Sequence, residues 1–491
     1  MEKIFDNPAR LESLVKQKFS FPDFIMMENA ALAIKQLIEK LAVKPSKCLI
    51  LCGKGNNGGD GYALARLLGN SCKIFLYRLA EPTADEAKKQ YDICKKLKLT
   101  FLDDKKVLSF LNNYSPKNDA PLFIIDCLFG TGFHGELPAK AAAIINAANK
   151  TTSIRIACDI SSGLAFNARY TVTMGEHKLA LFGDKAKAVS GQIIVASLGI
   201  DRAIFESQQN PAAFLVTCDD VNLPYRTDKA SHKGTYGHTA VFAGEKSGAA
   251  IICATAAMNF GSGLTSLVQT KDSNLGQFKI SPELMICKNG IPAKTNCVVL
   301  GPGINTFSEN DFTQLSEWFN SSRIQNPSIV LDAGIFDNPL FSKLLNVINA
   351  QADSRIVLTP HLLELVRLCK QLKISSSVTT QALASSPELK IAIGKKFNKL
   401  YKNAVLVIKS ANTFIAAGGQ TYIILDGCQS LAKGGSGDVL AGMIASLLSQ
   451  GYSAKDAAIT ACETHALISQ KIGEKAFNLS PEKIIKEIKN L

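Results

Sequence analysis

The stretch Leu431–Gly442, LAKGGSGDVLAG, decides how the second half of the chain is interpreted. Its centre is a glycine-rich turn, and the apolar run Val439–Leu448 that follows predicts a helix. Glycines relax the backbone, so successive N–H groups at a helix N-terminus can converge on an anion such as phosphate. Asp438 at the edge of this turn would repel a phosphate unless it had a chemical role. Accepting the proton of a substrate hydroxyl during phosphoryl transfer is a role that fits.

A purely structural explanation of this turn is a glycine C-cap followed by an N-cap aspartate. A plain cap needs one glycine, whereas this turn contains three, at Gly434, Gly435 and Gly437. The phosphate-binding interpretation is therefore favoured.

The first half of the chain alternates apolar strand-like runs with helical patterns. Strands are predicted at 47–52, 72–77, 122–126 and 154–159, and helices at 24–41, 84–97 and 139–148. This alternation is typical of βαβ units around a mostly parallel sheet. Three strands run into polar clusters: GKGNNGGDG (Gly53–Gly61), DCLFGTGFHGE (Asp126–Glu136) and DISSG (Asp159–Gly163). Because ligands bind beyond the carboxyl ends of such strands, we expect a site where the three clusters meet.

The segment Gly53–Gly58 also matches the GxGxxG pattern of dinucleotide-binding folds. Two features count against a nicotinamide-dependent oxidoreductase. No acidic residue ends the second strand, which closes with Arg78, and the loop continues to Asp60, a carboxylate where pyrophosphate would lie. A tight strand–helix turn would explain the glycines but not Asn56, Asn57 and Asp60.

A polar, proline-bearing stretch around residue 215 separates two domains, predicted as 1–214 and 215–491. The second domain is again α/β, with strands expected at 239–244, 297–301, 328–332, 355–359, 404–409, 413–416 and 421–425. Polar residues again follow strands, at Gly301–Gly303, Asp332, Thr359–His361 and Lys409–Thr413. His361 could merely cap a helix, although its place after a strand favours a ligand-facing role. The GxxxxGK[ST] pattern is absent, so the chain is not a P-loop NTPase.

Composition limits the remaining function classes. The 491 residues carry a net charge of +13 with pI near 9.0, but the basic residues are scattered, so no nucleic-acid partner is expected. The 13 cysteines form no CxxC pair and read as reduced thiols. Neither a signal peptide nor a membrane-spanning apolar run is visible, which predicts a cytoplasmic protein without a membrane partner. We also expect the protein to be a homo-oligomer.

These motifs resemble two enzyme families. GKGNNGGDG, DCLFGTGFHGEL and DISSGL are similar to the NAD(P)H-hydrate epimerases. HKGTYG (His232–Gly237), Gly301–Gly303, LDA (Leu331–Ala333), TPHxxE (Thr359–Glu364), Lys409–Thr413 and LAKGGSGDVLAG resemble the ADP-dependent NAD(P)H-hydrate dehydratases of the ribokinase-like superfamily. Together and in this order they resemble the bifunctional NAD(P)H-hydrate repair enzymes. The resemblance implies a Rossmann-like three-layer αβα domain followed by a larger ribokinase-like α/β domain.

For the first domain, the resemblance implies interconversion of the R and S hydrates of NADH and NADPH. Asp159 would be catalytic, and a potassium ion would be held by Asn57, Asp126 and Ser162. Contacts with the hydrate are expected from Asn56, Asn57, Gly58, Gly59, Asp60, Gly130, Thr131, Gly132, Phe133, His134, Gly135, Glu136 and Asp159.

For the second domain, the resemblance implies dehydration of the S hydrate with ADP and Mg²⁺, leaving AMP and phosphate. Asp438 would be catalytic, and Gly303, His361 and Asp438 would face the hydrate. Nucleotide contacts are expected from Lys409, Ser410, Ala411, Asn412, Thr413 and Gly437. The partners are thus hydrated NADH or NADPH and ADP.

Three positions depart from the family's usual motifs. Ser161 stands where the family has proline, Ser410 where it has glycine, and Cys428–Ser430 where it commonly shows NPGM. None of these changes removes a proton-transfer or anion-binding group. A vitamin or sugar kinase would share the glycine-rich turn but would not explain GKGNNGGDG. A scaffold domain of an RNA-handling protein would not need the intact polar cluster Asn57, Asp60, Asp126 and Asp159.

Overall fold

The computed structural model describes residues 1–41, 46–69, 72–116, 120–321 and 325–490. The chain divides into two compact units, Lys3–Ala212 and Ala213–Leu491, the latter joined by Met1–Glu2. The sequence places the division after residue 214. Within the described ranges, no helix is both long and apolar enough to cross a membrane. The cysteines, all within those ranges, are free thiols.

The first unit is built on a parallel sheet whose strand order is β4-β3-β2-β5-β6-β7-β9. Because β2 pairs with β3 on one side and β5 on the other, the chain reverses its winding direction between β2 and β5, where open α/β sheets bind ligands. A short parallel pair joins β1 and β8. The strands are β1 (Glu2–Phe5), β2 (Lys47–Cys52), β3 (Lys73–Arg78), β4 (Thr100–Leu102), β5 (Leu122–Cys127), β6 (Ile154–Cys158), β7 (Tyr170–Met174), β8 (His177–Lys178) and β9 (Gln192–Ala196).

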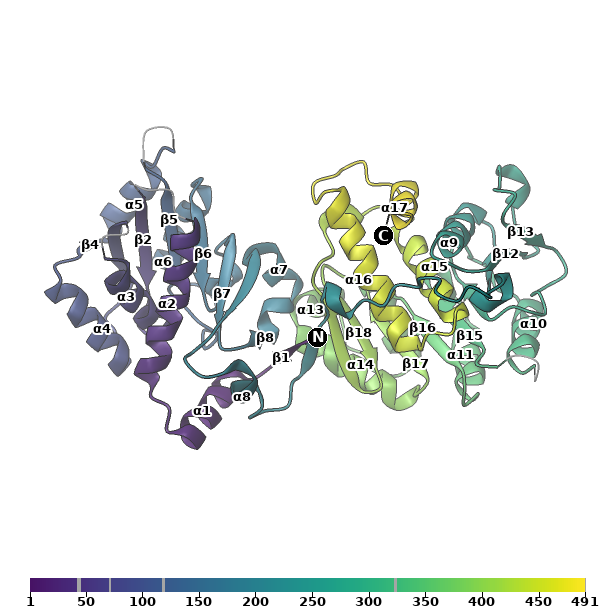
Figure 1. Ribbon diagram of the computed structural model, residues 1–491, viewed down its shortest axis with the longest axis horizontal. Helices are drawn as coiled ribbons and strands as arrows, with labels where there is room; N and C mark the ends of the chain where they lie inside the picture. The colour runs from purple at the N-terminus through teal and green to yellow at the C-terminus, as the bar shows by residue number, and fades with distance from the viewer. Residues whose placement is uncertain (42–45, 70–71, 117–119, 322–324, 491) are drawn as a thin grey trace. The chain divides into compact units, whose positions relative to one another are not determined.

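Both faces of this sheet are covered by helices. Alternate residues of β2 point to opposite faces: Cys48, Ile50 and Cys52 join the core beneath α2 and α3, and Leu49 and Leu51 join the core beneath α5 and α6. This confirms the predicted three-layer Rossmann-like arrangement (Figure 1). The helices are α1 (Pro8–Phe19), α2 (Asp23–Leu41), α3 (Asn56–Leu68), α4 (Asp85–Lys96), α5 (Asp104–Asn112), α6 (Ala139–Lys150), α7 (Asp184–Ser190) and α8 (Arg202–Glu206).

The second unit contains the strand order β13-β12-β11-β14-β15-β16-β17-β18-β19-β10. The pairs are parallel except β17–β18 and β18–β19, which are antiparallel. The strands are β10 (Ala213–Leu215), β11 (His238–Ala243), β12 (Leu264–Gln269), β13 (Met285–Cys287), β14 (Cys297–Leu300), β15 (Ser328–Leu331), β16 (Arg355–Leu358), β17 (Ala404–Ile408), β18 (Thr413–Ala417) and β19 (Gln420–Ile424). The carboxyl ends of β14 to β17 therefore lie along one edge.

Helix α15 is the central helix of this unit. It packs against α9 and α16 over β14 and β15, and Figure 1 shows α15 and α16 side by side. Helix α14 packs on β17 and β18. The helices are α9 (Ser247–Asn259), α10 (Glu309–Phe319), α11 (Phe341–Asn349), α12 (Leu362–Gln371), α13 (Thr380–Ser385), α14 (Pro387–Leu400), α15 (Ser436–Ser449), α16 (Ala454–Ile472) and α17 (Pro481–Ile488).

The predicted α/β class is confirmed for both units, but some elements escaped the sequence prediction. Helix α16 is the longest of these, and it is buried almost all round. Its buried positions include Thr460, Glu463, Thr464, His465 and Ser469, so it lacks the apolar stripe by which a surface helix is recognised.

Close packing of α15 on α9 depends on Gly442. A Cβ at this position would overlap the Cys253 carbonyl oxygen and meet the Ala256 Cβ. We expect Gly442→Ala to lower the free energy of unfolding by about 1–3 kcal/mol, because the helices must separate. Denaturant unfolding measures this, with Gly276→Ala as the control, since a Cβ there meets no atom within 4 Å. Equal stability of the two variants would contradict the packing described.

Candidate functional site

The first unit contains a cavity of about 870 Å³ at the carboxyl ends of β2 and β5, where the winding direction changes. It brings together residues from all three polar clusters that the sequence singled out. The predicted residues that line it are Asn56, Asn57, Asp60, Gly130, Thr131, Gly132, Phe133 and Asp159. Segments far apart in the chain thus converge on one hollow of a size suited to a small ligand.

Other predicted residues lie elsewhere. A Cβ on Gly58 would overlap the Gly53 carbonyl oxygen, and a Cβ on Gly59 would meet the side chain of Met27, so both glycines allow α3 to pack closely. His134, Gly135 and Glu136 are exposed on the loop that follows β5.

Asp126 and Ser162 are directly bonded beside this cavity. The Ser162 hydroxyl donates to Asp126 Oδ1 at 2.7 Å, and the Ser162 N–H donates to Oδ2 at 2.8 Å. Burial raises the pKa of Asp126 to about 6, although these hydrogen bonds lower it. Asn57 lines the cavity, and its amide oxygen and nitrogen are buried without a hydrogen bond to any described residue. Buried oxygens of this kind are the ligands that a hard cation prefers. The described residues contain no group of three or more Asp, Glu, His or Cys side chains that could hold a metal ion, so amide and hydroxyl oxygens would have to contribute.

Asp159 has a left-handed backbone conformation, and one oxygen of its carboxylate is bound by neighbouring groups. Its φ of 70° lies in the left-handed region, which for a residue other than glycine costs on the order of 1–3 kcal/mol. Its N–H donates to the Val172 carbonyl at 2.7 Å, which helps hold this conformation. Oδ1 pairs with the buried Lys178 ammonium and accepts from the Met174 N–H at 3.3 Å. The strain is retained at a residue that lines the cavity, as is common in functional sites.

In the second unit, the glycine-rich turn leads directly into α15. Gly435 is the N-cap residue with φ of 90°, a conformation that requires glycine, and no described side chain caps the helix. Gly437 needs to be small for another reason, since a Cβ there would lie 3.3 Å from Lys409 Nζ. Asp438 lies in the first turn of α15. The open N–H groups, the helix dipole and Asp438 therefore occur together, as the sequence suggested.

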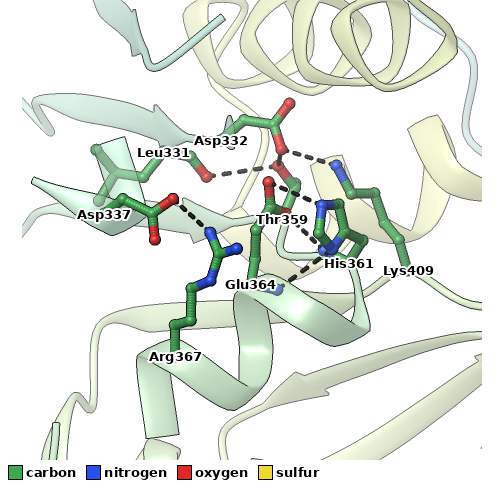
Figure 2. Close-up of polar contacts among 8 residues, drawn as sticks. All are labelled: Leu331, Asp332, Asp337, Thr359, His361, Glu364, Arg367 and Lys409. Atoms are coloured by element: carbon green, nitrogen blue, oxygen red, sulfur yellow. Dashed lines mark hydrogen bonds and ion pairs between the residues drawn. The ribbon is translucent and has the colours of Figure 1, made fainter. Parts of the chain in front are cut away.

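Asp332, Thr359 and Lys409 come from three neighbouring strand ends, and the last two both contact Asp332 (Figure 2). Lys409 Nζ lies 2.7 Å from Asp332 Oδ1, and the Thr359 hydroxyl donates to the same oxygen at 2.8 Å. Asp332 is 2% exposed, so the ion pair is largely shielded from water. The other Asp332 oxygen faces Gly437, because a Cβ on that glycine would lie 3.9 Å from it.

His361 caps α12 and is locked to Glu364 (Figure 2). The His361 N–H donates to Glu364 Oε2 at 2.8 Å, and the Glu364 N–H donates to His361 Nδ1 at 3.2 Å. Burial and then Lys409 lower the pKa of His361, which favours the neutral ring. Because Nδ1 accepts a hydrogen bond from the Glu364 N–H, the proton of the neutral ring lies on Nε2. The cap interpretation and the ligand-facing one are compatible, because the ring remains exposed.

The segment Lys409–Thr413 is held in place by hydrogen bonds of Ser410. Ser410 accepts from Lys390 Nζ at 2.7 Å and donates to the Asn412 carbonyl at 2.6 Å. The serine that replaces the family's usual glycine thus anchors the loop to α14. Gly303 lies at the end of β14, where φ of 71° and the nearby Lys246 carbonyl require glycine.

The charged groups of this site change the pKa of Asp438. Burial and then the Asp332 charge raise the pKa of Asp438 to about 6, whereas Lys409 lowers it. Burial likewise raises the pKa of Glu364 to about 7. A carboxylate with a pKa of about 6 is still mostly ionised at pH 7, and it is basic enough to accept a proton from a substrate.

Comparisons with known proteins match both units of the chain. A family model described as NAD(P)H-hydrate dehydratase matches residues 239–490, and one described as YjeF-related protein N-terminus matches residues 23–180. The bifunctional NAD(P)H-hydrate repair enzyme of Helicobacter pylori is 33% identical over 500 residues, covering 100% of both chains. The chain belongs to the family of bifunctional NAD(P)H-hydrate repair enzymes. The Moorella thermoacetica member of this family is 30% identical over 93% of this chain and 89% of its own.

Two solved structures align with part of this family member. An ADP/ATP-dependent NAD(P)H-hydrate dehydratase from Bacillus subtilis, co-crystallised with ATP and Mg²⁺, is 23% identical with a TM-score of 0.44, over 54% of this chain and 92% of that one. A ribokinase-like superfamily protein from Enterococcus faecalis is 19% identical with a TM-score of 0.44, over 57% of this chain and 95% of that one.

Several residues of these sites carry no role in the sequence-based prediction. The sequence did show polar residues after strands at Asp332 and Thr359, with Glu364 in the helix that follows Thr359. That position was the one sequence feature that could have marked them as site residues. Lys178 is the second residue of the two-residue strand β8 and stands before an apolar run in GEHKLALF, and the sequence there offers no signal. Glu12 and Lys54 also line the first cavity.

The electrostatics of the second site predict pKa changes of opposite sign. Asp332→Asn should lower the pKa of Asp438, because a neighbouring negative charge is lost, and Lys409→Met should raise it, because a positive charge is lost. Titration of ¹³C-labelled aspartate carboxyls by NMR measures both. Lys433→Met, which removes an exposed lysine near the turn, should change nothing. Shifts of the same sign in the first two variants would contradict this arrangement.

Proposed function

We propose that the chain repairs hydrated NADH and NADPH in two steps, one in each unit. The first unit interconverts the R and S hydrates, and the second dehydrates the S form with ADP. The observation that carries the proposal is Asp438, an aspartate with a raised pKa in the first turn of a helix whose N-terminal N–H groups have no described side-chain cap. The names of the family's characterised members support the same activities.

In the second unit, ionised Asp438 would accept the proton of the hydrate hydroxyl as its oxygen attacks the terminal phosphorus of ADP. The bond between that phosphorus and the bridging oxygen breaks, which leaves AMP. Loss of phosphate from that ring carbon, together with a proton from the adjacent carbon, then restores the double bond of NADH or NADPH. The N–H groups that open α15, together with Lys409, would stabilise negative charge on the transferred group.

Gly303 and His361 would face the hydrate, while Lys409, Ser410, Ala411, Asn412, Thr413 and Gly437 would face the nucleotide. ADP would enter with Mg²⁺, and the carboxylate of Asp332, which lies close enough to Asp438 to raise its pKa, is an oxygen donor of the kind that this ion prefers. When bound, the ion would neutralise charge on the phosphates.

In the first unit, the hydrate would occupy the 870 Å³ cavity with Asp159 as the catalytic carboxylate. A potassium ion would be held by Asn57, Asp126 and Ser162, whose buried oxygens fit a cation. When bound, the ion would supply positive charge next to the hydrate. The unpaired amide of Asn57 is the feature that supports this ligand set best.

Substitution should separate the two activities. Asp438→Asn removes the proposed base with almost no change in volume, so dehydration should fall by about 10²–10⁴-fold while epimerisation is unchanged. Asp159→Asn should leave S-hydrate consumption intact and make the R hydrate persist. Chromatography of both epimers over short times, against an enzyme-free reaction, measures the two rates. Loss of both activities from either substitution would refute the assignment of one activity to each unit.

Potassium binding should be visible as stabilisation of the folded state. With potassium at about 100 times its Kd, mass action predicts about 2.7 kcal/mol of added stability relative to tetramethylammonium. Asn57→Ala should abolish this increment, and Asn56→Ala, which removes the adjacent exposed amide, should keep it. Unfolding in chloride salts of the two cations measures the difference. An increment that survives in the Asn57 variant would exclude this residue as a ligand.

A further inference from the structure

Lys178 is buried close to the first cavity and contacts Asp159, one of the residues that line it. The lysine is 1% exposed, and it is not among the described residues that line the cavity. Its ammonium pairs with Asp159 Oδ1, the oxygen that also accepts the Met174 N–H. This oxygen is therefore fully engaged inside the protein.

The second oxygen of Asp159 lies close to another residue that lines the cavity. A Cβ built on Gly130 would lie 3.4 Å from Asp159 Oδ2 and 3.6 Å from the Cβ of Asn57. Gly130, Asn57 and Asp159 all line the cavity. One carboxylate oxygen is thus anchored in the interior, and the other is directed at the space where a ligand would bind.

Lys178 is held in its charged form by the groups around it. Burial opposes the charge, but Asp159 of the loop after β6, Glu176 before β8 and Glu12 of α1 outweigh burial, so the pKa of Lys178 is raised. Burial also raises the pKa of Glu176 to about 8 and the pKa of Asp60 well above its usual range. At neutral pH Glu176 is therefore largely protonated, and Asp159 is the carboxylate that Lys178 contacts directly.

We propose that Lys178 is a positioning residue of the epimerase site: by holding Oδ1 of Asp159 it directs Oδ2, with its charge, at the bound hydrate. The proposal rests on the proposed epimerase function. A merely structural ion pair would contribute little, since pairs of buried charges barely offset their own desolvation. A positioning role instead predicts that catalysis is lost while substrate binding persists.

The test compares variants of the full-length chain in R-hydrate epimerisation. Lys178→Met should lower kcat by about 100-fold, because an unanchored carboxylate loses its alignment, and it should change KM by less than about threefold. Lys178→Arg keeps the charge and should recover about a tenth of the wild-type kcat or more. Should the methionine variant not fold, Lys178→Gln, which is also uncharged but polar, serves in its place with the same expectation.

Glu176→Gln is the matched control, because it alters the same buried cluster and leaves the contact between Lys178 and Asp159 in place. Its kcat should stay within about threefold of wild type. ADP-dependent consumption of the S hydrate, measured in the same samples, should be equal in all variants. A wild-type kcat in the uncharged variant, or an equal loss in Glu176→Gln, would overturn the positioning role. An inactive wild-type chain would refute the epimerase function itself, which keeps the two failures distinct.

Discussion

Asp332 is almost fully buried at the end of β15, and a carboxylate in that position is tolerated only because Lys409 and the Thr359 hydroxyl contact it. This contact joins the ends of three adjacent parallel strands. It also fixes the Lys409 ammonium beside Gly437, where the first turn of α15 begins. The position of the positive charge and the pKa of Asp438 both depend on it.

A similar solution occurs in the first unit, where Lys178 and Asp159 form a buried pair near the end of β6. In both units a parallel sheet brings strand ends to one edge, and a lysine from a more distant segment neutralises an aspartate there. The two pairs differ in what they leave available. Lys409 remains partly exposed in the segment proposed to contact the nucleotide, whereas Lys178 is enclosed and only Asp159 reaches the cavity.

Much of this architecture could be predicted from sequence because strand ends and glycine-rich turns leave local signals. The positions of Asp126 and Asp159 at the ends of strands, and of Asp438 at the start of a helix, follow from apolar runs and turn residues alone. The contacts of Lys178 could not be predicted, since they depend on tertiary packing over a two-residue strand. Nor could the sequence show that Gly58 and Gly59 serve packing while Asn57 faces the cavity, because neighbouring residues of one helix point in different directions.

The central claim is that Asp438 takes the proton of the hydrate hydroxyl while that oxygen attacks phosphorus. The most direct test follows this oxygen. S hydrate prepared in ¹⁸O-labelled water carries the label in its hydroxyl group, and its reaction with ADP in ordinary water is analysed by mass spectrometry of the released phosphate. The account predicts one ¹⁸O atom in each phosphate formed, because the carbon–oxygen bond breaks after phosphoryl transfer. Label in the solvent, with unlabelled phosphate, would contradict it.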